Sequence, residues 1–345
     1  MGNTSSPKYV VFDKNMTSIV KGFAILFMFM LHCYDDYKYD VELDYSNALM
    51  FAHGGYNVCV GMYAFMIGFG YSFAKKKDWH YSLQHIKKVV LPYWSIFFFF
   101  MLPCCYQAFF SSGIRTIFFT FIGFDTTYHY YNWFIYLFVV SMLVMPSFSR
   151  FIDKKPIRNS AIIIFIIYAL EVVTHPFLPH LEDNNVICFF LNCFQVTPVV
   201  ILGYLFAHER YYERIRVDKL PAPLVMVGSI LTIIVVLILC HNLRVRFGFL
   251  FDFFYAPIVI GAIVVFFNKF NIRPFRAVMA KLGWASMYMW FLHASFHTPT
   301  IRWFYQPIIT IFSNVNIVVL WTFIVVFCWA WIVRSVIDRV MGTSK

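Results

Sequence analysis

The chain has 345 residues, of which 61% are hydrophobic and 13% are charged, and its mean hydropathy is +0.68. A soluble domain could not bury this much apolar surface, so the composition excludes a water-soluble fold and favours an integral membrane protein. The formal net charge of +11 does not require a nucleic-acid partner, because its meaning depends on which loops carry it.

Ten apolar runs are long enough to cross the roughly 30 Å hydrocarbon layer of a bilayer. In chain order they cover residues 17–34, 54–74, 89–111, 130–147, 160–175, 186–207, 222–241, 248–267, 279–298 and 313–334. The sequence therefore predicts an all-α fold, a polytopic transmembrane helix bundle of about ten spans. Residues 114–124 are too short to cross and are expected to be re-entrant or interfacial, which leaves the count open by one or two.

Basic residues fall mainly on alternate loops. Counted loop by loop, 23 of the 28 Lys and Arg lie on one side of the predicted membrane, and the other side holds Lys38, Arg115, Arg244, Arg246 and Arg302. Such a bias follows the positive-inside rule, so both termini are expected in the cytoplasm. The positive charge is then a topology signal with affinity for anionic lipid headgroups, and it implies no nucleic-acid partner.

The chain is expected to form one domain. No internal repeat, low-complexity tract or long linker divides it, so residues 1–345 are expected to be a single transmembrane domain. The eight Cys lie mostly within apolar runs, without a paired Cys motif or metal-ligand spacing. They are expected to be small buried hydrophobic residues, and the sequence predicts no metal site.

Polar side chains gather in the outer halves of the predicted spans. The set consists of His32, His53, His129, His175, His241, His293 and His297, joined by Asn132, Glu171 and Asp252. Ionisable groups at membrane depth cost several kcal/mol unless they face water or a partner, so they mark functional sites. The set predicts a polar cavity that opens outward, while single members are equally explained as hydrated groups at the interface.

The first span carries the sharpest pattern. Lys21 and His32 are eleven residues apart, about three helical turns, so both lie on one helix face with about 16 Å between their Cα atoms. This spacing suits a ligand with an anionic end and a reactive end, such as a phosphorylated thioester. Lys21 would hold phosphate, and neutral His32 would act as general base toward an attacking hydroxyl. The alternative is a Lys that only anchors the span at the interface.

Four further segments carry motifs: residues 54–69, with Gly68 and Phe69 at the end; residues 85–94, with a basic cluster before Leu-Pro; residues 132–136; and residues 282–293. Together with the first span, and in this order, they resemble motifs of the acyltransferase-3 family of integral membrane acyltransferases. Lys21 stands where that family usually has Arg, and Lys87 and Lys88 also replace arginines, so bidentate phosphate contacts are not available there.

The resemblance implies a membrane O-acyltransferase of the bacterial cytoplasmic membrane. Such an enzyme moves an acyl group, usually acetyl, from cytoplasmic acyl-CoA to a hydroxyl of a cell-envelope saccharide, with acyl-CoA as co-substrate and no metal. By the same implication His32 is the base, and the donor-side residues are Lys21, Lys87, Lys88 and His85. The residues expected to hold the acceptor are Asn132, Trp133, Glu171, Asp252 and His293.

Several alternatives stay open. A multi-span transporter or flippase for an envelope glycan or small solute would use the same buried His and acids, although no repeat supports it. A receptor is a weaker alternative. Direct transfer is simpler than an acyl-enzyme on Cys33 or Ser286. The acid that orients His32 is left open among Asp35, Asp36, Glu171 and Asp252.

Overall fold

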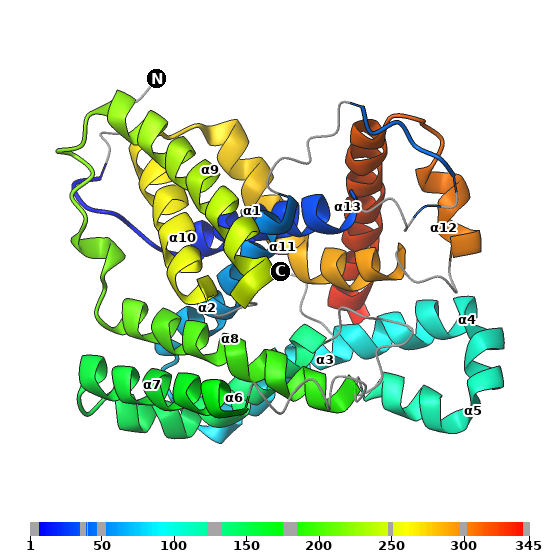
Figure 1. The fold of residues 1–345 in the computed structure, drawn as a ribbon, viewed down its shortest axis with the longest axis horizontal. Helices are drawn as coiled ribbons and strands as arrows, with labels where there is room; N and C mark the ends of the chain where they lie inside the picture. Colours follow the sequence, from blue (N-terminus) through cyan, green and yellow to red (C-terminus); the bar gives the residue numbers. More distant parts are fainter. Residues whose placement is uncertain are drawn as a thin grey trace.

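The computed structural model describes residues 7–34, 39, 41–46, 53–122, 133–174, 185–247, 251–296 and 302–340. Within these ranges the regular secondary structure is helical, and β pairing is limited to two isolated bridges. The predicted all-α fold is therefore confirmed (Figure 1).

The long helices and the shorter elements between them follow the predicted runs. The long helices are α1 (Lys14–His32), α2 (Val58–Ser72), α3 (Trp79–Ile96), α6 (Trp133–Ile152), α7 (Pro156–Thr174), α8 (Asn185–His208), α9 (Ala222–Phe247), α10 (Asp252–Lys269), α11 (Arg273–Phe296) and α13 (Val315–Val340). The shorter elements are η2 (His53–Asn57), η3 (Phe97–Met101), α4 (Leu102–Cys104), α5 (Tyr106–Phe121), η6 (Tyr212–Arg214) and α12 (Arg302–Ile309).

Seven helical stretches in the described residues are long and apolar enough to cross a membrane. They are Lys14–His32, Trp79–Cys104, Trp133–Ile152, Pro156–Val173, Ala222–Leu243, Asp252–Lys269 and Val315–Val340. The chain is thus an integral membrane protein, while the count of ten spans and the side of the termini stay predictions. Figure 1 shows α6, α7 and α8 grouped along the lower edge and α9 beside α10 at the upper left.

The third span differs from its predicted bounds. A continuous helical stretch runs over Trp79–Cys104, and the chain then turns back into α5. The Tyr93 hydroxyl donates to the Thr120 carbonyl at 2.6 Å, and the Trp94 indole N–H donates to the Phe121 carbonyl at 3.2 Å. The end of α5 therefore lies against the last turn of α3, and residues 106–111 belong to the returning helix.

Glycines bring two helix pairs into backbone contact. A Cβ on Gly22 of α1 would overlap the Met279 carbonyl of α11, and a Cβ on Gly283 of α11 would overlap the Ser18 carbonyl of α1. Small residues of this kind let membrane helices approach closely, so that backbone packing replaces the missing hydrophobic effect. The α1–α11 pair carries both the first and the last of the predicted motifs.

The second pair, α2 with α8, is built the same way. A Cβ on Gly68 would overlap the Val200 carbonyl, and a Cβ on Gly203 would overlap the Phe65 carbonyl. At the end of this pair the Lys77 ammonium contacts both Asp153 and the Tyr204 hydroxyl, which ties the segment after α2 to the α6–α7 turn and to α8.

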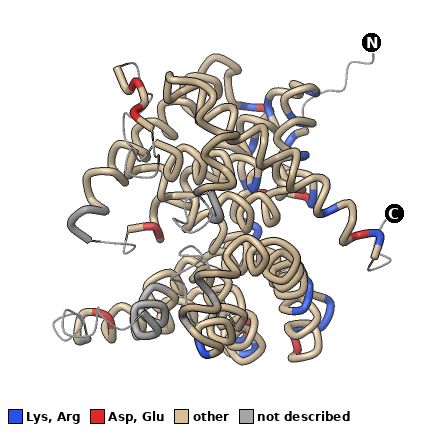
Figure 2. Tube along the Cα trace, turned by 90° about the vertical axis from the view of Figure 1, so that its right-hand side faces the viewer, with Lys and Arg blue, Asp and Glu red and all other residues tan. Residues whose placement is uncertain are grey.

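An extended strap, residues 7–13, precedes α1. Asn268 of α10 accepts from the Val11 N–H at 2.8 Å and donates to the Val11 carbonyl at 3.1 Å. Phe12 packs on Phe69 with 4.3 Å between ring centroids, and the Asp13 carboxylate caps α1 by accepting from the Met16 N–H at 2.8 Å. In Figure 2 the Lys and Arg lie mainly toward the right-hand side of the view.

Candidate functional site

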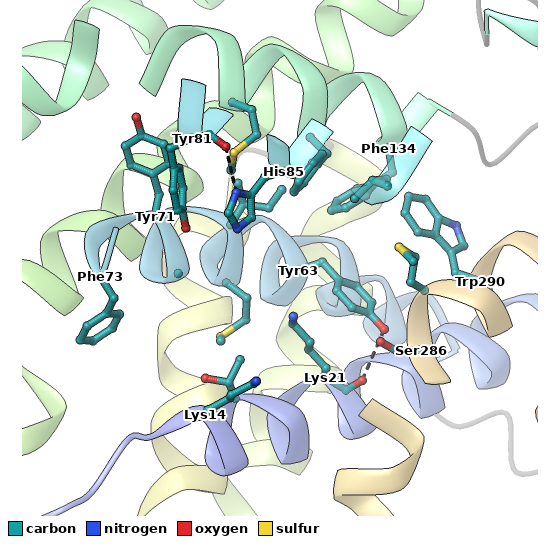
Figure 3. A pocket seen from close by; sticks show the side chains of 18 of the residues that line it. Lys14, Lys21, Tyr63, Tyr71, Phe73, Tyr81, His85, Phe134, Ser286 and Trp290 are labelled. Atoms are coloured by element: carbon teal, nitrogen blue, oxygen red, sulfur yellow. Dashed lines mark hydrogen bonds between the residues drawn. The ribbon is translucent and has the colours of Figure 1, made fainter. Parts of the chain in front are cut away.

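A cavity of about 630 Å³ lies between the strap, α1, α2, α3, α6 and α11 (Figure 3). We call it the wide chamber. Most of its wall is apolar, and its charged, imidazole and aliphatic hydroxyl groups are Asp13, Lys14, Thr17, Lys21, His85 and Ser286. A large apolar pocket with a few polar groups that fix orientation is the usual form of a small-molecule site.

Lys21 is the cation at the centre of the wide chamber. Its side chain projects from α1 into the cavity (Figure 3). The described part of the chain gives its ammonium no carboxylate partner, and the nearby Arg334 is a second cation. Because a charge held in an apolar cavity requires a counter-charge, this arrangement favours an anionic ligand.

Arg334 of α13 is a second cation near Lys21, outside the wall of the wide chamber. Its guanidinium stacks on the Trp284 ring at 3.9 Å, donates to the Trp284 carbonyl and pairs with Asp338 at 3.3 Å. The sequence assigns Arg334 only to the loop charges. Its position between α11 and α13 depends on tertiary packing.

A second cavity of about 40 Å³ lies at His32, and we call it the narrow chamber. Its wall consists of Met28, His32, Cys59, Val60, Tyr63, Trp133, Phe134 and Trp290. Tyr63, Phe134 and Trp290 also line the wide chamber. We call these three rings the aromatic partition, because they separate the cation of α1 from its histidine.

The aromatic partition is a mutual ring contact between α2, α6 and α11. Ring centroids are 4.7 Å apart for Phe134 and Trp290, 5.9 Å for Tyr63 and Phe134, and 6.5 Å for Tyr63 and Trp290. The Tyr63 hydroxyl donates to the Lys21 carbonyl at 3.3 Å and lies within hydrogen-bonding reach of Ser286. The partition is thereby fixed to α1 at the residue that carries the ammonium.

His32 stacks on a second imidazole. The rings of His32 and His293 have centroids 5.4 Å apart and planes at 28°. His293 is fully buried, and its Nδ1 lies 2.6 Å from the Trp290 carbonyl. Because a carbonyl only accepts, Nδ1 carries the hydrogen, and in neutral His293 the other ring nitrogen, Nε2, is an acceptor. Two predicted site residues from the two ends of the chain thus meet here.

The basic motif of α3 is divided by its helix geometry. His85 lines the wide chamber in one row with Tyr81 and Val89, at four-residue spacing. Its Nδ1 lies 2.9 Å from the Tyr81 carbonyl. Lys87 lies on another face of α3, whereas Lys88, three residues after His85, lies at the edge of this row. Both are exposed and outside the wall of the wide chamber.

The predicted acceptor residues also separate. Trp133, the first residue of α6, lines the narrow chamber, whereas Asn132 lies outside the described residues. Asp252 is buried at the start of α10 against Gly61 of α2, and Glu171 lies on α7. Neither carboxylate lines either chamber, although both act electrostatically on Tyr168. Asp35 and Asp36 lie outside the described residues.

Sequence reasoning missed the aromatic partition as a site feature. Trp290 lies three residues before His293, and Phe134 directly follows Trp133. Their closeness in sequence to predicted site residues is the signal that could have identified them.

Ser286 donates to the Gly283 carbonyl at 2.9 Å and lines the wide chamber. In the described residues no group of three or more His, Cys, Asp or Glu is arranged to hold a metal ion.

The chain matches a known protein family. A family model described as an acyltransferase domain matches residues 18–335, nearly the whole chain, including both helix pairs and all of the narrow chamber. Comparison with curated proteins and with solved structures gives no match.

Proposed function

Because the chain belongs to the acyltransferase-3 family of integral membrane acyltransferases, we propose that it transfers an acetyl group from acyl-CoA to a hydroxyl of a cell-envelope saccharide. The proposal assigns the wide chamber to the donor and the narrow chamber to the reaction, with His32 as general base. The observation that carries it is the single helix α1, which presents the Lys21 ammonium to one chamber and the His32 imidazole to the next.

The wide chamber suits the donor in size and charge. Its volume of about 630 Å³ lies in the usual range for ligand pockets. Lys14 and Lys21 would hold phosphate, and the apolar wall from α2 and α6 would take the pantetheine arm. About 16 Å separates the Cα atoms of Lys21 and His32 along a helix, a gap that an extended pantetheine arm can span. Exposed Lys87 and Lys88 would attract the phosphates from solution.

The distribution of basic residues supports a cytoplasmic position for the opening of the wide chamber. We place the mouth of the wide chamber where the strap, the start of α1 and the start of α3 line it, beside loops rich in Lys. The positive-inside rule assigns these loops to the cytoplasm, where acyl-CoA is found. In this orientation the narrow chamber lies deeper in the membrane, and the acceptor would approach from the opposite side of a bacterial cytoplasmic membrane.

The chemistry needs one base and no metal. The oxygen of the acceptor hydroxyl attacks the thioester carbonyl, and neutral His32 takes the proton of that hydroxyl. The tetrahedral intermediate then expels the CoA thiolate, which receives the proton back from the His32 imidazolium. Products are the O-acetyl ester and free CoA, so atoms and charge balance.

Acceptor binding would use the far wall of the narrow chamber. Trp133 offers a ring face on that wall. His293 lines neither chamber, so it would act on the acceptor through the His32 ring on which it stacks. Asn132 would extend this wall. Glu171 and Asp252 lie outside both chambers, so their part in acceptor binding would require a second contact with a large saccharide.

The test is a transfer assay with matched histidine variants. Membrane vesicles holding wild type, His32→Ala or His80→Ala receive radiolabelled acetyl-CoA and a panel of envelope glycans. His80 is exposed and lines neither chamber, so His80→Ala should label glycan like wild type, whereas His32→Ala should not.

Two outcomes would contradict the proposal. Equal transfer by wild type and His32→Ala would remove His32 as the base. Glycan movement across the vesicle membrane without any use of acyl-CoA would favour the transporter alternative.

A further inference from the structure

We infer that the aromatic partition sets the length of the acyl group that reaches His32, with Trp290 as the main specificity-determining residue. The inference rests on the proposed acyl-CoA donor. Beyond that donor assignment, the three rings of the partition restrict the acyl group to acetyl, and truncation of Trp290 relaxes that restriction.

The partition lies on the path of the acyl group. Tyr63, Phe134 and Trp290 form part of the wall of both chambers. In Figure 3 these three side chains lie together at one end of the wide chamber, and Lys14 lies near the other end. A thioester held by the cations of α1 therefore meets these rings before it meets the imidazole of His32.

The narrow chamber beyond the partition is small. A buried water needs about 10–15 Å³ of such volume, so 40 Å³ holds about three water-sized groups. An acetyl group has three non-hydrogen atoms. A butyryl or succinyl group would have to displace an aromatic ring or remain in the wide chamber with its carbonyl away from His32.

The rings resist such displacement. Phe134 is buried and meets Trp290 edge to face at 4.7 Å, the geometry that aromatic pairs prefer. The Tyr63 hydroxyl is bound to the Lys21 carbonyl. The carbonyl of Trp290 accepts from His293, which ties the backbone that carries the indole to the partner of His32.

Among the three residues of the partition, Trp290 is the best position for a substitution that tests acyl-length selection. It is the largest of the three and contacts both of the others. Replacement of Tyr63 would also remove a hydrogen bond beside the donor cation, so its effect would mix specificity with donor binding. Truncation of Trp290 enlarges the narrow chamber and leaves its backbone carbonyl in place for His293.

The experiment measures binding of non-hydrolysable thioether analogues of acetyl-, butyryl- and octanoyl-CoA, with free CoA as reference, to the purified full-length protein in nanodiscs. The readout is the ratio of the Kd of each longer analogue to that of the acetyl analogue. Wild type should disfavour the octanoyl analogue by about tenfold or more, since added methylenes in a hydrophobic pocket discriminate on this scale. Trp290→Ala should reduce that ratio by about tenfold.

Two further variants make the result specific. Phe134→Leu opens the same partition from α6 and should shift the ratio in the same direction, which keeps the test valid if Trp290→Ala fails to fold. Phe138→Ala removes a ring that lines only the wide chamber. It should weaken all CoA ligands alike and leave the ratio as in wild type.

The outcomes distinguish the inference from the proposed function. If the acetyl analogue binds and both partition variants keep the wild-type ratio, the partition does not select acyl length, while the donor site stands. If wild type binds all three analogues equally, the inference is overturned as well. If no CoA ligand binds wild type, the proposed donor is wrong, and the inference fails with it.

Discussion

The two chambers on α1 differ in the way their walls are built. The wide chamber has an apolar wall with the Lys21 ammonium at its centre, whereas the narrow chamber is lined by aromatic rings and by His32, which stacks on His293. The first arrangement provides attraction for an anion but offers little selectivity for the group attached to it. The second offers little volume but provides a base in a fixed position. Binding and chemistry are thus separated along one helix.

This separation is tested most strongly at His32. His32→Ala should lower kcat by about 10²–10⁴-fold, because a positioned general base contributes on that scale. The Kd for acetyl-CoA should stay near that of wild type, since the donor's anionic groups lie in the other chamber. The measurement pairs turnover, with the acceptor found in the transfer assay, with donor binding. An equal loss in both quantities would show that the chambers do not act separately.

Lys21 should show the opposite pattern. Lys21→Ala removes the central ammonium of the wide chamber and should weaken donor binding by about 10–150-fold, the equivalent of a charged hydrogen bond of about 1.5–3 kcal/mol. The kcat at saturating donor should change less than in His32→Ala. Lys21→Arg should restore binding, because a guanidinium also pairs with phosphate. A pure anchor at the membrane interface would instead leave donor affinity unchanged in Lys21→Ala.

A change in the α1–α11 contact should affect both chambers at once. Gly283→Ala places a methyl group against the Ser18 carbonyl and should destabilise the protein by about 1–3 kcal/mol, as overpacking does. A Cβ on Gly228 of α9 meets nothing within 4 Å, so Gly228→Ala should be neutral or slightly stabilising. Thermal unfolding in detergent provides the comparison. Equal unfolding temperatures for the two variants would contradict the close backbone contact.

Much of this arrangement follows from local sequence, and some does not. The face shared by Lys21 and His32 depends only on helix periodicity, so it could be predicted. The meeting of His32 with His293, and the ring contacts of Tyr63 and Trp290, depend on how α1, α2 and α11 pack. Local pattern does not contain that information.

The basic motif of α3 shows a different limit. Taken as one cluster, His85, Lys87 and Lys88 suggest a joint contact with the donor. Of the three, only His85 lines the wide chamber, while Lys87 and Lys88 are exposed outside it. The cost of burying an acid in a membrane predicts a site role for Asp252, yet Asp252 is buried against α2 and lies outside the chamber of His32.

The smallest expected effect concerns the strap at the mouth of the wide chamber. Asn268 holds Val11 by two hydrogen bonds, and Phe12 and Asp13 of the strap line that chamber. Asn268→Ala should cost about 1–3 kcal/mol of local stability, measured as faster amide exchange in residues 8–13. Donor binding should weaken by a few fold, without any change in kcat, because the strap does not reach the narrow chamber.

The matched control for this variant is Asn242→Ala. Its side chain donates to the Ile238 carbonyl one turn earlier in α9 and is exposed, so amide exchange in the strap and donor affinity should stay as in wild type. A fall in kcat for Asn268→Ala at saturating donor would mean that the strap controls the chemistry as well as the entrance. The division between a binding chamber and a reaction chamber would then be too simple, because a contact at the mouth of one would govern the other.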